Sequence, residues 1–216
     1  MKQLVIFDLD GTLLNTIGDL AASCDEVLKR HNLPTYSYDE YASFVGNGVM
    51  RLVERAIPEE LRTEEFVAEL RGEFVEYYFE NIHQHTVPYP DIAWMLRELK
   101  KRGIAMAVAS NKFQRGTEKL IAHFFPEIHF EMVLGQRAGV ALKPNPQIVR
   151  DICQFTSFTP DKILYVGDSG VDMETAAAAG VESVGVVWGF RSREELEQSG
   201  ADHIITSPKE IVLMFD

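Results

Sequence analysis

Two short acidic clusters in this sequence could bind a metal ion. Asp8 and Asp10 follow the apolar run LVIF, and Asp168 and Asp172 follow the apolar run ILYV. Residues two apart in an extended segment face the same way, so we expect Asp8 and Asp10 to point together while Leu9 turns into the core. Paired carboxylates repel one another unless a cation or a proton separates them, and such oxygen ligands suit Mg²⁺. Turn formation after the first run and helix capping by Asp172 are the alternatives.

A second set of polar residues could bind an anion. Ser110, Asn111 and Lys112 follow the apolar run IAMAVA. A serine hydroxyl and successive backbone N–H groups near a helix start would form an anion cradle, although a serine N-cap is the alternative. Lys143 stands in the segment ALKPNP. A surface lysine is usually just solvated, but one cation beside four acids is what a phosphate site in an acidic protein needs.

The composition limits the partners that this chain can have. Its 216 residues include 33 acidic and 21 basic ones, which gives a formal charge of −12. A field of that sign repels nucleic acid and anionic membranes, so we expect neither as a partner. Any phosphate site must therefore be locally cationic or hold a metal ion. Cys24 and Cys153 lie far apart without metal-type spacing, which favours free thiols in a reducing compartment.

The sequence lacks the patterns typical of membrane proteins, secreted proteins and several enzyme classes. No apolar stretch approaches the ~20 residues that span a bilayer, and the opening MKQLVIFDLDGT is too short and too quickly acidic for a signal peptide. We therefore expect a soluble, cytoplasmic protein. The sequence also contains no GxSxG, GxxxxGK[ST] or GxGxxG motif, which argues against serine hydrolases, P-loop enzymes and dinucleotide enzymes.

The elements that must position these residues follow an alternating pattern. Short apolar runs at 4–7, 104–109, 163–166 and 183–187 predict strands buried on both faces, and 131–134 is a weaker candidate. Helical periodicity lies between them, with Gly103 and Gly180 as predicted C-caps. This alternation predicts a doubly wound, Rossmann-like α/β domain with a parallel sheet.

One long segment interrupts the pattern. Residues 15–85 contain several amphipathic helices and no convincing strand, so we predict an all-helical insertion there and an α/β core over 1–14 and 86–216. An insertion after the first strand lies where ligands bind in this architecture. A lid over the site is one interpretation, and a purely structural subdomain is the other.

Taken in order, four motifs resemble those of the haloacid dehalogenase superfamily: DLDGT at 8–12, SNK at 110–112, KPNP at 143–146 and GDSGVDMETAAAAG at 167–180. The resemblance covers nearly the whole chain. It implies the superfamily's α/β core, with the helical insertion as its cap. The second acid, Asp10, favours phosphate chemistry, because a halide leaves without being protonated.

The resemblance also implies roles for individual residues. Asp8 would be the nucleophile that forms an aspartyl-phosphate, and Asp10 the acid and base. Mg²⁺ would be bound by the Asp8 carboxylate, the Asp10 main-chain carbonyl and Asp168, while Asp172 would support the metal through its waters or orient Lys143. The phosphoryl oxygens would be held by Thr12, Ser110, Asn111 and Lys143.

Two further segments are similar to phosphoglycolate phosphatases: FVGNGVMRLVERA at 44–56 and the tail that begins VVWGF at 186. Gly46, Asn47 and Gly48 would form a loop that closes over the site, and Arg51 would bind a substrate carboxylate. Helix breaking by the glycines and a surface role for Arg51 are the alternatives. A role for Trp188 and Phe190 stays open.

The resemblance thus implies a phosphatase of small phosphorylated metabolites, with phosphoglycolate as the expected substrate. We expect a monomer or homodimer. A β-phosphoglucomutase-like mutase and a pyrophosphatase are rivals on the same core. A non-catalytic phosphometabolite-binding protein is the alternative from another class, although a sensor would need only some of the acidic and basic residues found here.

Overall fold

Six parallel strands make up the main sheet of the computed structural model, which describes residues 2–46 and 48–215. The predicted runs form five of these strands, and the short strand β8 was not predicted. The spatial order is β5-β4-β1-β6-β7-β8. The strands are β1 (Leu4–Phe7), β4 (Ala105–Phe113), β5 (Met132–Gln136), β6 (Ile163–Gly167), β7 (Glu182–Val186) and β8 (His203–Ile205).

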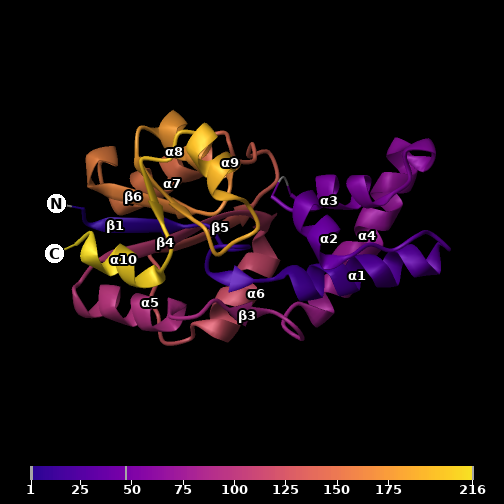
Figure 1. Cartoon of the computed structure of the whole chain (residues 1–216), viewed down its shortest axis with the longest axis horizontal. Coiled ribbons are helices and arrows are strands. Elements are labelled where there is room, and N and C mark those ends of the chain that lie inside the picture. The colour runs from indigo at the N-terminus through magenta and orange to yellow at the C-terminus, as the bar shows by residue number, and fades with distance from the viewer. Residues whose placement is uncertain (1, 47, 216) are drawn as a thin grey trace. The chain divides into compact units, whose positions relative to one another are not determined.

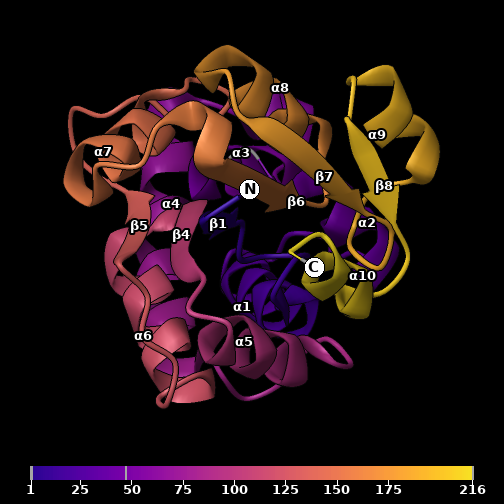
Figure 2. The ribbon, with the colours of Figure 1, turned by 90° about the vertical axis from the view of Figure 1, so that its left-hand side faces the viewer.

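Helices cover both faces of this sheet, which confirms the doubly wound α/β fold (Figure 2). Alternate side chains of a strand point to opposite faces, so a central strand such as β1 is apolar throughout and fully buried. Leu4 and Ile6 join one core layer with residues of α7 and α8. The helices of this part are α5 (Ile92–Lys101), α6 (Gln114–Phe124), α7 (Gln147–Thr156), α8 (Gly170–Ala179), α9 (Arg193–Gln198) and α10 (Pro208–Leu213), with a 3₁₀ turn η2 (Pro160–Lys162).

The predicted helix stops are confirmed. Gly180 follows α8 with φ of 70°, and Gly103 follows α5 with the same value. This left-handed conformation carries little steric cost for glycine, and it lets the chain leave the helix and enter the next strand.

The chain divides into two compact units: an α/β unit of Met1–Asn15 and Pro88–Asp216, and a helical unit of Thr16–Val87. The described residues of the helical unit form α1 (Ile17–Arg30), α2 (Tyr38–Phe44), α3 (Val49–Ala56), the 3₁₀ turn η1 (Glu59–Leu61) and α4 (Glu64–Asn81) (Figure 1). Two short strands, β2 (Leu14–Asn15) and β3 (Val87–Pro88), pair near the passage between the units. The boundaries at 15 and 85 stay a prediction.

A buried carboxylate ties the two ends of the helical unit together. Asp19, in the first turn of α1, accepts hydrogen bonds of 2.8 Å from the backbone N–H groups of both His85 and Thr86. The side chain is almost fully buried, so these donors replace the water that it loses on folding.

Across the described parts of the chain, no helix has the length and apolar character needed to cross a bilayer.

Candidate active site

The carboxyl ends of three adjacent strands carry several of the predicted site residues of the α/β unit. Asp8 follows β1, Ser110 lies near the end of β4, and Asp168 follows β6. Strand β1 pairs in parallel with both β4 and β6. Parallel pairing aligns like ends of the strands, so these side chains meet at one edge of the sheet, where ligands bind in this class of fold.

A buried lysine joins two of the acids. Lys143 Nζ lies 2.9 Å from Asp8 Oδ1 and 2.7 Å from Asp172 Oδ1, and it donates to the Ala109 carbonyl at 3.0 Å. Burial by itself would lower the pKa of Lys143, but the carboxylates of Asp172 and Asp8 outweigh it and raise the pKa well above its usual value. The ammonium is therefore a permanent positive charge beside the predicted nucleophile.

Asp172 pairs with Lys143 through one carboxylate oxygen and accepts hydrogen bonds at the start of α8 through the other. Its Oδ1 faces Lys143, while its Oδ2 accepts hydrogen bonds from the Ser169 hydroxyl at 2.6 Å and the Ser169 N–H at 3.2 Å at the start of α8. The helix-capping alternative and the expectation that Asp172 orients Lys143 are thus compatible. Tyr165, which the sequence analysis missed, adds its hydroxyl 3.3 Å from Asp172 Oδ1. A tyrosine within the buried apolar run ILYV was the signal for such a contact, because a buried hydroxyl usually needs a partner.

Three buried carboxylates lie close enough together to hold one cation. Asp8, Asp168 and Asp172 each offer an oxygen, and these oxygens lie within 4.8 Å of one another. Burial raises the pKa of Asp8 to about 7 despite the opposing charge of Lys143. Burial, followed by the charges of Asp172 and Asp8, raises the pKa of Asp168 well above its usual range. Such carboxylates ionise easily only when a further positive charge is present, so the residues fit a divalent metal ion.

Asp172 has both an ammonium and a hydroxyl as close partners. Both of its oxygens are engaged by Lys143 and Ser169. The donors to Asp168, the Phe190 N–H and the Thr12 hydroxyl, are neutral. A metal ion that contacts Asp168 and the adjacent Asp8 would supply positive charge that these donors do not. An oxygen-only ligand set with few protein ligands suits Mg²⁺, which keeps several of its waters.

A loop after β7 closes against Asp168 and the segment that follows β1. The Phe190 N–H donates to Asp168 Oδ2 at 2.7 Å, and the Trp188 indole N–H donates to the Thr12 carbonyl at 3.0 Å. Thr12 in turn places its buried hydroxyl 3.3 Å from Asp168 Oδ1. Trp188 and the Phe190 backbone thus support the acidic cluster, which answers what the sequence left open. The predicted phosphate-binding role of Thr12 stays a prediction.

Gly189 lets this loop approach the acidic cluster. A Cβ atom at this position would lie 2.3 Å from Asp168 Cβ and 2.4 Å from the Gly11 carbonyl. We expect Gly189→Ala to displace Asp168 and weaken Mg²⁺ binding at least tenfold, in the range seen when groups that orient metal ligands are lost. Mg²⁺ titration followed by calorimetry measures this. Gly72→Ala is the control, because nothing lies within 4 Å of its added Cβ. Equal Mg²⁺ affinity in Gly189→Ala and the unmodified protein would contradict the assignment.

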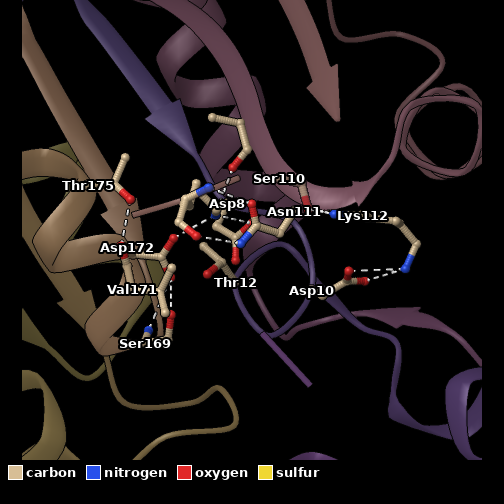
Figure 3. Close-up of polar contacts among 12 residues, drawn as sticks. Asp8, Asp10, Thr12, Ser110, Asn111, Lys112, Ser169, Val171, Asp172 and Thr175 are labelled. Atoms are coloured by element: carbon tan, nitrogen blue, oxygen red, sulfur yellow. Dashed lines mark hydrogen bonds and ion pairs between the residues drawn. The ribbon is translucent and has the colours of Figure 1, made fainter. Parts of the chain in front are cut away.

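Asp10 does not point with Asp8, contrary to expectation. Both oxygens of Asp10 face Lys112 Nζ, at 2.8 and 3.0 Å, and Figure 3 shows this pair apart from the group around Asp8. The reason is that the chain bends after β1 instead of staying extended. The Leu9 carbonyl accepts from the N–H groups of residues 12, 13 and 14, so the rule for alternating side chains fails there. Leu9 is buried, as expected.

Ser110, Asn111 and Lys112 lie within β4, which continues to Phe113, and α6 begins only at Gln114. The serine N-cap alternative is therefore wrong, because the residue before the helix is Phe113. Ser110 is buried, and its Oγ accepts from the Lys112 N–H at 3.2 Å. The pairing register of β4 with β5 shifts between Ala109 and Phe113, so the strand is irregular where the polar residues lie.

The side chain of Asn111 binds the backbone of Lys143, a contact that the sequence did not predict. Its Oδ1 accepts from the Lys143 N–H at 2.8 Å, and its Nδ2 donates to the Lys143 carbonyl at 3.1 Å. This reciprocal pair fixes the backbone of Lys143 and so aims its ammonium at Asp8. No sequence signal reveals it, because the two residues are 32 positions apart.

The predicted cap residues belong to the helical unit. Gly46 and Gly48 adopt φ of 115° and 82°, and Gly48 precedes α3. Asn47 lies outside the described residues. Arg51 is largely exposed and donates to Glu54 Oε2 at 2.7 Å. The positive φ values explain the glycines locally, so their proposed contact with substrate stays a prediction.

Comparison with known proteins gives one consistent result. Residues 5–186 match the model of the haloacid dehalogenase-like hydrolases. A phosphoglycolate phosphatase of Aquifex aeolicus is 30% identical over 214 residues, which are 99% of this chain and 97% of that protein. One from Haemophilus influenzae (strain 86-028NP) is 33% identical over 208 residues, 94% of this chain and 93% of its own.

The solved structures agree with the sequence relatives. A protein from Haemophilus somnus, described as a predicted phosphoglycolate phosphatase, superposes with a TM-score of 0.91 at 31% identity and covers 100% of this chain and 98% of its own. The likeness therefore extends over both units, and it includes every segment that carries a predicted site residue.

Proposed function

This chain belongs to the haloacid dehalogenase-like hydrolase family, and we propose that it is a Mg²⁺-dependent phosphatase of small phosphate monoesters, with 2-phosphoglycolate as the preferred substrate. One observation carries the proposal: the buried carboxylate of Asp8 lies 2.9 Å from Lys143 Nζ and beside Asp168 at the carboxyl edge of the sheet. A carboxylate between a fixed cation and a metal-binding acid is equipped to attack an anionic phosphoryl group. The near full-length likeness to phosphoglycolate phosphatases supports the substrate.

In the proposed reaction, an Asp8 carboxylate oxygen attacks phosphorus and the bond to the ester oxygen breaks. Asp10 gives its proton to that leaving oxygen, so an alcohol departs and Asp8 becomes an aspartyl-phosphate. Asp10, now a base, takes a proton from water, whose oxygen attacks phosphorus. Inorganic phosphate leaves and the Asp8 carboxylate and the proton on Asp10 are restored. Lys143 and Ser110, with the Asn111 N–H, hold the phosphoryl oxygens.

Mg²⁺ would be held by the carboxylates of Asp8 and Asp168 and by the Asp10 main-chain carbonyl. It supplies positive charge that offsets the repulsion between the nucleophilic carboxylate and the phosphoryl oxygens. Asp172 contributes through Lys143, whose ammonium it holds at 2.7 Å. Two lysines and four ionised acids give this group of residues a net charge of −2, which one divalent cation would neutralise.

We also propose that residues 15–85 act as a cap that selects the substrate, with 1–14 and 86–216 as the catalytic core. Gly46, Asn47 and Gly48 would form the loop over the site, and Arg51 would bind the carboxylate of 2-phosphoglycolate. The formal charge of the chain, −12, favours a small metabolite over nucleic acid or membrane as partner. A cytoplasmic location and a monomeric or homodimeric state complete the proposal.

Phosphate release from a panel of esters tests this function. We expect release from 2-phosphoglycolate at the highest kcat/KM, lower rates with glycerol phosphate and hexose phosphates, and loss of release when EDTA removes the metal. Glycerol phosphate, which has no carboxylate, is the matched comparison for substrate choice. If kcat/KM were highest with pyrophosphate, pyrophosphate would replace 2-phosphoglycolate as the proposed substrate, and the proposed mechanism would stand. Isomerised sugar phosphate without release would favour a mutase, and binding without any turnover would favour a phosphometabolite-binding protein.

A further inference from the structure

Lys112 is a buried lysine of the site for which the proposed mechanism has no role. Its Nζ lies 2.8 Å from Asp10 Oδ1 and 3.0 Å from Asp10 Oδ2, although the residues are 102 positions apart. The side chains are only 3% and 13% exposed. A surface pair such as Lys101–Glu98, by contrast, has a lysine side chain that is 70% exposed. Such surface pairs contribute little, whereas a buried pair restricts both side chains strongly.

The two buried lysines pair with different acids of the site. Lys143 lies between Asp8 and Asp172, while Lys112 faces both oxygens of Asp10. Figure 3 shows that the Asp10–Lys112 pair stands apart from the cluster around Asp8 and Asp172. Lys112 extends from β4, a strand inside the sheet, so its base is held rigidly. A rigid cation that faces both carboxylate oxygens fixes the plane and direction of that carboxylate.

We propose that Lys112 is the positioning residue of Asp10, which sets the carboxylate from which the leaving oxygen receives its proton. The inference rests on the proposed function, because there Asp10 acts as acid and base. Lys112 itself is not assigned to the phosphate, which Lys143 and Ser110 hold. Loss of Lys112 should therefore impair proton delivery more than substrate binding.

The leaving group reveals this role. An alkyl ester such as 2-phosphoglycolate expels an oxygen that needs a proton, whereas 4-nitrophenyl phosphate expels a stable anion that needs none. Because kcat/KM reports the steps up to formation of the aspartyl-phosphate, the ratio of kcat/KM for the two esters isolates proton donation. General acid catalysis contributes about 10²–10⁴-fold. We expect Lys112→Met to lower the alkyl-to-aryl ratio at least tenfold, with KM nearly unchanged.

Three variants complete the experiment. Lys112→Arg keeps a cation and should restore most of the ratio, and Lys101→Met, at the exposed pair, should leave it unchanged. Asp10→Asn should lower the ratio further than Lys112→Met. If Lys112 had only a structural role, Lys112→Met would lower kcat/KM for both esters by the same factor, because misfolding reduces the active fraction of the protein. The ratio of the two kcat/KM values would then be unchanged, and that result would overturn the inference.

Failure of the two proposals can be told apart. If Asp10→Asn lowers the ratio and Lys112→Met does not, the positioning role is wrong and the proposed function stands. If Asp10→Asn also leaves the ratio unchanged, Asp10 is not the acid, and the proposed mechanism and the role of Lys112 are both overturned.

Discussion

Asp8→Asn should abolish phosphate release and at the same time stabilise the metal-free protein near pH 8. An amide cannot form the phosphorylated intermediate, so we expect kcat to fall by about 10⁴-fold or more, as when other catalytic nucleophiles are removed. The stability gain has a separate cause. Burial raises the pKa of Asp8 from 3.8 to about 7 in the folded protein.

The sign of the pH effect follows from proton binding. The folded protein holds the Asp8 proton more tightly than the unfolded chain, so between about pH 4 and pH 7 folding becomes progressively less favourable as the pH rises. Above pH 7 the penalty is complete, on the order of 2–4 kcal/mol. Asp8→Asn removes it, while Lys143 keeps Asp172 as a partner at 2.7 Å.

Urea unfolding in EDTA at pH 5 and pH 8 measures the effect, and we expect the variant's advantage to be larger at pH 8. Asp202→Asn is the matched control of opposite sign. Hydrogen bonds from the Ser183 backbone and hydroxyl lower the pKa of Asp202, so loss of its charge should destabilise the protein. Added Mg²⁺ should stabilise the unmodified protein more than Asp8→Asn. A variant that is inactive yet less stable than its parent at pH 8 would contradict the account of Asp8.

Lys143→Met should be the most destabilising substitution in the site. It leaves Asp8 and Asp172 buried without their shared cation, and breaking a buried ion pair in this way costs about 3–5 kcal/mol. Activity should also be lost, because no other cationic side chain is assigned to the phosphoryl oxygens. Methionine fills a similar volume, so the effect isolates the charge.

The loss of stability in Lys143→Met should shrink as the pH falls, since Asp8, whose pKa burial raises to about 7, can then take up a proton. Urea unfolding across pH 5 to 8 measures this, and the double variant Lys143→Met/Asp172→Asn should recover part of the stability without activity. Lys162→Met removes an exposed ion pair with Asp161 and should leave the free energy of unfolding nearly unchanged. A Lys143→Met protein as stable as Lys162→Met would show that the buried network does not hold the site together.

Local signals in the sequence determined the frame of the site. The runs before Asp8 and Asp168 are continuous and apolar because strands at the centre of a doubly covered sheet bury both faces. Parallel strands bring their carboxyl ends together, so polar residues at the end of each run were predictable as neighbours without coordinates. The ends of the helices before Gly103 and Gly180 were also predictable, because the left-handed conformation that ends a helix favours glycine at that position.

The tertiary structure alone decided the partner of each side chain. Asp10 faces Lys112 because the chain bends after β1, and periodicity describes only residues within a regular element. Asn111 holds the backbone of Lys143, and Trp188 donates to the Thr12 carbonyl from 176 positions away. Such contacts depend on the path of loops between strands, and no spacing within a single segment encodes them. Residue types at strand ends therefore determined which chemistry is available, while long-range packing decided which acid each cation serves.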